Sequence, residues 1–230
     1  MRLTSAHISA QAALRSNATR AVELLWDSLP AYNRPDVDVW LERVLPVIAA
    51  TQRQSVTITE AYLASALERP PIGVDAAELV GSAVRAGTDP SEVYSRPFVH
   101  IWTALGEGVS YNDAVAAGLA QAKGSAAMDV QLSARATFEA VQQADDGIYG
   151  YQRVADGGAC DFCQMIDGAY VKSADAMALH NNCGCSLEPL TAPHPRVAKL
   201  PSGVAVHDHG ELGAVLTSPE HSFTGPSGLT

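Results

Sequence analysis

Four cysteines and one histidine gathered in a short stretch place the strongest constraint on this chain. They are Cys160, Cys163, His180, Cys183 and Cys185, with the spacing C-x2-C-x16-H-x2-C-x-C. Thiolates and an imidazole bind Zn²⁺ in closed tetrahedral sites, and a C-x2-C pair is typical of the first half of such a site. The pattern therefore predicts a structural Zn²⁺ that stabilises the surrounding segment.

Five candidate ligands compete for about four positions around the ion. The prediction takes Cys160, Cys163, His180 and Cys185 as the ligands. Cys183 stays an alternative to Cys185, because residues two apart on an extended strand lie about 6.5 to 7 Å apart. Three thiolates and a neutral imidazole would close the site, which favours a structural role over a catalytic one.

The cysteines and histidine of this stretch also allow chemistries other than structural zinc binding. A zinc deaminase places H-x-E before its cysteine pair, whereas His209-Gly210-Glu211 follows the cysteines here, which excludes that class. Two disulfides and a redox C-x2-C remain alternatives. A metal-dependent nuclease using His180 with Asn181 and Asn182 is a further alternative, as is a second metal site at His207 and His209.

Length and charge restrict the class of protein. The 230 residues, 47% of them hydrophobic and 6% aromatic, allow one large domain or two small ones and favour closely packed helices. The net charge of −10 argues against a broad basic surface for duplex nucleic acid. No secretory signal or apolar run of about 18 residues is evident, so we expect a protein of a cytoplasm with no membrane partner.

Hydrophobic periodicity predicts a helical N-terminal region. Apolar residues recur at three- to four-residue steps in segments that cover residues 3–30, 36–48, 49–68, 99–109 and 111–146. Pro46 falls inside the second segment and is expected to kink or split it. Trp26, Trp40 and Trp102 lie on apolar helix faces and are expected in the core. Arg135, on the last helix, faces either solvent or an acidic partner.

The character of the chain changes after residue 146. Short runs at residues 148–154, 169–173 and 185–190 read as strands around the cysteines, and prolines, glycines and serines dominate from residue 191 onward. We expect a helical assembly region at 1–146, a metal-binding knob at 147–190 and an extended tail at 191–230. The predicted fold class is mainly α, with a small α+β zinc-stapled C-terminal knob and an extended tail.

Three pieces of the knob resemble a known family. They are Cys160-Asp161-Phe162-Cys163, then Asp167-Gly168-Ala169-Tyr170, and finally the ten residues His180 to Pro189, HNNCGCSLEP. Together they resemble the C-terminal end of the phage Mu F-like (MuF-like) minor head proteins. The stretch from His209 to Leu216, HGELGAVL, also resembles a tail motif of such proteins in phages of actinobacteria. Asn181 and Gly184 depart from the family pattern, which often has a proline and a basic residue there.

The resemblance implies a function that spacing alone does not give. It implies a minor capsid protein of the virion head, made in the host cytoplasm and acting in head morphogenesis with the portal or the major capsid protein. Contact with packaged DNA would have to proceed without a basic surface. We find no catalytic constellation and expect no enzyme; the alternative function is a metal-dependent nuclease or another zinc enzyme.

Overall fold

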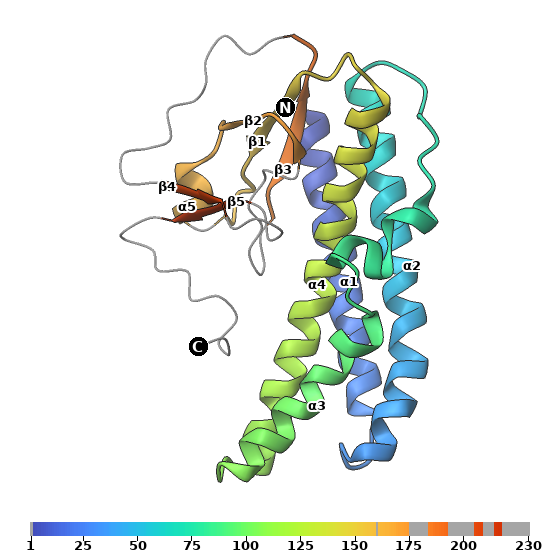
Figure 1. Cartoon of the computed structure of the whole chain (residues 1–230), viewed down its shortest axis with the longest axis vertical. Helices are drawn as coiled ribbons and strands as arrows, with labels where there is room; N and C mark the ends of the chain where they lie inside the picture. Colours follow the sequence, from blue (N-terminus) through green and yellow to red (C-terminus); the bar gives the residue numbers. More distant parts are fainter. Residues whose placement is uncertain (1, 160, 175–183, 193–204, 209–213, 218–230) are drawn as a thin grey trace.

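The computed structural model describes residues 2–159, 161–174, 184–192, 205–208 and 214–217 (Figure 1). Within this part of the chain, four long helices form an elongated bundle, and a small sheet lies beside one end of it, near the start of α1. The helices are α1 (Arg2–Asp27), α2 (Arg34–Ala66), α3 (Pro90–Gly106) and α4 (Tyr111–Ala144). None of the helices in the described ranges is long and apolar enough to cross a membrane.

The predicted helical character of the N-terminal region is confirmed, but two predicted segments are one helix. α2 runs without a break through Pro46, so the proline does not split the helix. Pro46 lies on the exposed face of α2, so water can reach the carbonyl group that its missing N–H leaves unbonded. The helix begins with a capping box, in which Asn33 and Asp36 each accept a hydrogen bond from the other's backbone N–H.

A group of aromatic side chains lies within the core of the bundle, and the predicted burial of Trp26 and Trp40 is confirmed. Trp26 and Trp40 are fully buried, with their ring centroids 5.2 Å apart, and Phe98 of α3 packs against both. The indole nitrogen of Trp40 donates to the carbonyl oxygen of Tyr94 at 2.9 Å. Trp102 is partly buried beside the same cluster. These contacts join α1, α2 and α3 around one apolar centre.

The segment between α2 and α3 contains two 3₁₀ turns, η1 (Ala76–Leu79) and η2 (Gly81–Arg85). The Nε of Arg85 donates to a carboxylate oxygen of Asp129 on α4 at 2.6 Å, and the Tyr94 hydroxyl donates to the other oxygen at 2.7 Å. Burial raises the pKa of Asp129, while the bonds from Arg85 and Tyr94 oppose that rise. This paired, buried carboxylate holds the irregular segment and α3 against α4.

The sheet follows α4 and has the strand order β2-β1-β3, with both pairings antiparallel. Its strands are β1 (Gly150–Val154), β2 (Tyr170–Val171) and β3 (Ser186–Leu190), close to the three predicted runs, and the short helix α5 (Asp161–Met165) lies between β1 and β2. Tyr151 and Leu187 are fully buried in a cluster with Tyr62 and Phe138. The sheet therefore shares a core with α2 and α4.

The predicted extended tail is not supported. Its described residues β4 (Ala205–Asp208) and β5 (Ala214–Thr217) pair as antiparallel strands, with Val206 opposite Leu216. The apolar and β-branched residues in these two runs favour strand pairing. The composition of the whole segment, rich in proline and glycine, does not reveal these two short runs.

Two glycines of α4 give a matched test of the packing. A Cβ at Gly118 would lie 2.9 Å from Cγ1 of Ile101 and 3.1 Å from Cζ2 of Trp26, whereas a Cβ at Gly124 would meet no atom within 4 Å. Gly118→Ala should lower the free energy of unfolding by about 1 kcal/mol, because overpacking outweighs the gain in helix propensity. Gly124→Ala should raise it by up to about 1 kcal/mol. Equal stabilisation in urea titrations would contradict this packing.

Candidate functional site

A ladder of buried polar side chains runs between α1 and α2. On each helix its members are three or four residues apart, so they form one stripe, and the two stripes face each other. All of them are buried although the surrounding faces are apolar. The ladder consists of Thr4, His7 and Gln11 on α1, and Ser55, Thr59 and Tyr62 on α2.

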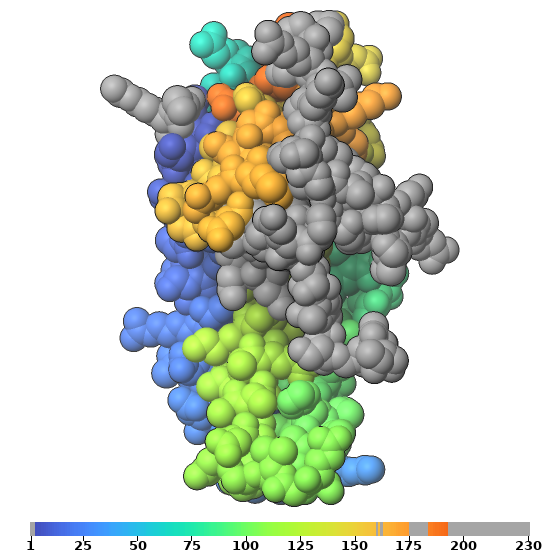
Figure 2. All heavy atoms as spheres, turned by 90° about the vertical axis from the view of Figure 1, so that its left-hand side faces the viewer, coloured from blue at the N-terminus to red at the C-terminus, as the bar shows by residue number. Residues whose placement is uncertain are grey.

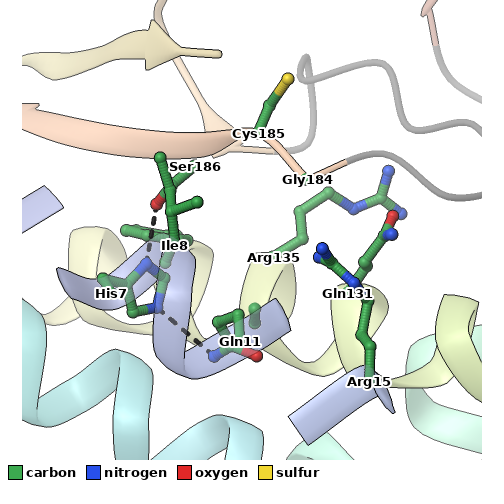
Figure 3. Close-up of a pocket in the computed structure, with 11 residues that line it drawn as sticks. His7, Ile8, Gln11, Arg15, Gln131, Arg135, Gly184, Cys185 and Ser186 are labelled. Carbon is green, nitrogen blue, oxygen red and sulfur yellow. Dashed lines mark hydrogen bonds between the residues drawn. The ribbon is translucent and has the colours of Figure 1, made fainter. Parts of the chain in front are cut away.

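His7 is the central member of the ladder and is 4% exposed. Its Nδ1 lies 2.8 Å from the Ser186 hydroxyl of β3, and its Nε2 lies 3.3 Å from the amide nitrogen of Gln11 (Figure 3). Nε2 also lies 3.2 Å from the hydroxyl of Thr59. Both ring nitrogens therefore have a hydrogen-bonding partner in either tautomer of His7.

Tyr62 makes the second connection from the ladder to the sheet. Its hydroxyl donates to the carbonyl oxygen of Leu187 at 3.0 Å and lies 3.0 Å from the hydroxyl of Thr4. Its ring stacks on that of His7, with the centroids 4.5 Å apart. Ser186 and Leu187, adjacent residues of β3, are thus bonded to α1 and α2 respectively, and the ladder fixes the sheet against the bundle.

A pocket opens beside the ladder, between α1, α4 and the beginning of β3. It encloses about 390 Å³, including space open to solvent. Ile8, Ala134 and Phe138 give it an apolar wall. Figure 3 shows the side chains of Arg15 and Arg135 reaching toward the side of the pocket below Gly184.

Gly184 forms part of the pocket rim and has little room for a side chain. A Cβ at this position would overlap the carboxylate of Asp156 and lie 3.3 Å from Nη2 of Arg15. The Asp156 carboxylate is held there by the backbone N–H of Gly158, at 2.8 Å. The backbone at residue 184 passes directly beside the Asp156 carboxylate, so a residue without a side chain is needed there. This explains why Gly184 occupies the position at which the family that the knob resembles often has a basic residue.

The zinc prediction is wrong for the part of the chain that can be examined. Among the described residues, no three His, Cys, Asp or Glu side chains form a group that could hold a metal ion. Cys163 and Cys185 are brought into one apolar cluster with Ile166. The guanidinium of buried Arg153 donates to Cys163 Sγ at 3.3 Å, so a cation already stands beside this thiol.

The other predicted ligands, Cys160, His180 and the alternative Cys183, lie outside the described residues. His209 of the second candidate metal site also lies outside them. Spacing identified side chains that can bind zinc, but it did not reveal that Arg153 of β1 would lie against one of them. In the described residues, a shared apolar core and the polar ladder hold the knob to the helices.

The bond between His7 and Ser186 has the length of a base–nucleophile pair, but its surroundings favour a structural role. Burial lowers the pKa of His7 from 6.5 to about 4, which makes the imidazole a weak base at neutral pH. Its second nitrogen faces Gln11 and Thr59, which are neutral groups. The network is suited to holding β3 in place and poorly suited to activating a hydroxyl.

Sequence reasoning missed both the ladder and the pocket. The available signal was the recurrence of Thr4, His7 and Gln11 on a helix whose other buried positions are apolar. Such a stripe is normally read as a solvent-facing edge, and its partners on β3 are about 180 residues away in the sequence. The sequence does not decide whether Arg135 faces solvent or an acidic partner, and in the structure it lines the pocket.

The chain matches the family model described as VG15 protein over residues 2–199. These residues include the four long helices, the three-stranded sheet and both sides of the pocket. No curated protein and no solved structure matches the chain.

Burial of the His7 imidazole predicts that the protein becomes less stable as the pH falls. The unfolded chain takes up a proton on His7 near pH 6.5 and the folded chain only near pH 4, so the unfolded state binds more protons between these values. His7 should therefore lower the free energy of unfolding by about 2 kcal/mol as the pH falls from 7 to 5. Urea titrations at the two pH values measure this loss.

One variant separates His7 from the other titrating groups. The free energy of unfolding of His7→Gln should fall less between pH 7 and pH 5 than that of the wild type, because the amide does not titrate. An unchanged loss in His7→Gln would show that the imidazole is not held neutral in the folded protein.

Proposed function

This chain belongs to the VG15 family, a family of phage virion-gene proteins, and from that premise we propose that it is a minor structural protein of the phage head. In this proposal it acts in head morphogenesis, beside the portal or on the inner face of the capsid. The proposed partners are the portal protein, the major capsid protein or both.

The family match carries the proposal. It extends over residues 2–199 and so covers the helical bundle and the sheet together. The motif that resembles the MuF-like minor head proteins supplies the strand that joins these two parts. Ser186 of that motif bonds to His7, and Leu187 bonds to Tyr62 and is fully buried. The resemblance thus falls on residues with a structural task.

The form of the bundle supports a role in assembly. α3 and α4 meet in a turn at the end of the bundle farthest from the sheet (Figure 1). Leu105, Val109 and Tyr111 at this turn are 37%, 41% and 48% exposed. Large apolar side chains gathered at one exposed end are typical of a surface that another protein covers. We propose that this end, named the α3–α4 tip, contacts the portal or capsid protein.

The proposal predicts that the chain is a component of purified phage particles. Quantitative mass spectrometry of gradient-purified virions should detect it at a constant ratio to the portal protein, and that ratio should survive a high-salt wash. Its absence from virions, with abundant chain in the lysate, would contradict a structural role in the head.

A matched pair of substitutions tests the tip within the same experiment. Val109→Asp places a charge on the tip, and Ile72→Asp places one at a similarly exposed position, 43% against 41%, in the loop that follows α2. Val109→Asp should reduce the amount of the chain in virions by about tenfold, because burying one unpaired charge at an interface weakens binding on that scale. Ile72→Asp should leave that amount unchanged. Equal incorporation of both variants would exclude the tip as the contact surface.

A further inference from the structure

The pocket between α1, α4 and β3 combines two features that favour one kind of ligand. Arg15 and Arg135 bring two guanidinium groups to it from different helices. Ile8, Ala134 and Phe138 line it with apolar carbon. A guanidinium presents parallel N–H donors that match the two oxygens of a carboxylate, and an apolar wall strengthens such a pair by excluding water.

Among the described residues, the acidic group one turn away on α4 does not pair with Arg135. Glu139, one helical turn further along α4, is the position from which a carboxylate normally pairs with an arginine. Its two oxygens instead accept hydrogen bonds from Ser173 at 2.6 Å and from Gln143 at 3.2 Å. Among the ion pairs between described residues, none includes Arg135.

Arg15, by contrast, stands close to an acidic group of the chain itself. Both its Nη2 and the carboxylate of Asp156 lie beside Gly184, at the rim of the pocket. Asp156 is tied to its own loop by the N–H of Gly158. A carboxylate of the chain itself thus lies at the rim beside Gly184 and Arg15, whereas Arg135 reaches the pocket from α4.

We propose that this pocket binds a carboxylate carried on a short aliphatic stem, namely the side chain of a glutamate on a peptide segment of another protein. The carboxylate pairs with Arg135, with Arg15 adding to the positive potential. The stem lies along Ile8, Ala134 and Phe138. The chain carries a net charge of −10, so the pocket is a local positive site on an acidic protein and would select such a segment by charge.

Gly184, Cys185 and Ser186, at the start of β3, line the pocket together with residues of α1 and α4. Figure 2 shows that the knob, in orange, lies directly over the blue α1 on the face in view. α1 and α4 also pack against each other along the bundle. A segment entering the pocket would thus contact the bundle and the sheet together, at the place where the polar ladder joins them.

Nuclear magnetic resonance with two matched probes tests the proposal on the full chain. The probes are N-acetyl-glutamate N-methylamide and the corresponding glutamine compound. In the glutamine compound a neutral amide replaces the charged carboxylate. The glutamate compound should shift the amide signals of Gly184 and Arg135 in a saturable manner. The glutamine compound should bind about tenfold more weakly, the scale of one lost charge-assisted pair.

Arginine variants identify the group that binds. Arg135→Gln should weaken binding of the glutamate compound by about tenfold, and Arg15→Gln should weaken it less. Arg53→Gln, at an exposed position of α2, should bind like the wild type. Amide signals of β3 report whether each variant keeps its fold.

Three results would overturn the proposal. The first is equal shifts at Gly184 with both probes, and the second is wild-type affinity in a folded Arg135→Gln variant. The third is binding of inorganic phosphate as tight as that of the glutamate compound, which would show a general attraction of anions without a contribution from the apolar wall.

Discussion

The hydrogen bonds of His7 are the constraint on which the arrangement of bundle and sheet depends. A buried polar group costs free energy unless it is bonded. Nδ1 of His7 has Ser186 on β3 as its partner, and Nε2 has Gln11 on α1 and Thr59 on α2. Tyr62 adds a second bond of the same kind, from α2 to Leu187. Any displacement of β3 from the helices would leave several buried donors and acceptors without partners. The ladder therefore specifies one docking geometry, which apolar packing alone would leave less sharply defined.

The sheet needs this support because it is small. One of its three strands has only two residues, and a sheet of this size is marginal without a packed face. That face is supplied by Tyr151 and Leu187 against Phe138 of α4, with the Tyr151 hydroxyl donating to the carbonyl oxygen of Phe138 at 2.6 Å. The pocket with Arg15 and Arg135 lies at the edge of the same junction. The residues that join bundle and sheet and those that offer a binding surface are thus neighbours.

Much of the helical part could be predicted, because periodicity depends on local sequence. The burial of Trp26 and Trp40 follows from their place on apolar faces. The continuity of α2 through Pro46 could not be predicted, because it depends on which side of the helix faces water. The zinc site was predicted from ligand types and spacing, and neither reveals that Arg153 lies against Cys163. The ladder was missed since its two halves are far apart in the sequence, and each half alone looks like a polar surface.

The central claim is that bundle and sheet form one cooperative unit, joined by the ladder. Native-state hydrogen exchange in increasing urea tests it most directly, by comparing the backbone amide of Arg153 in β1, which bonds to the carbonyl oxygen of Ala169, with that of Val130 in α4. We predict opening free energies that agree within about 1 kcal/mol and the same dependence on urea. Exchange of the Arg153 amide through a separate opening, several kcal/mol lower and nearly independent of urea, would contradict the claim.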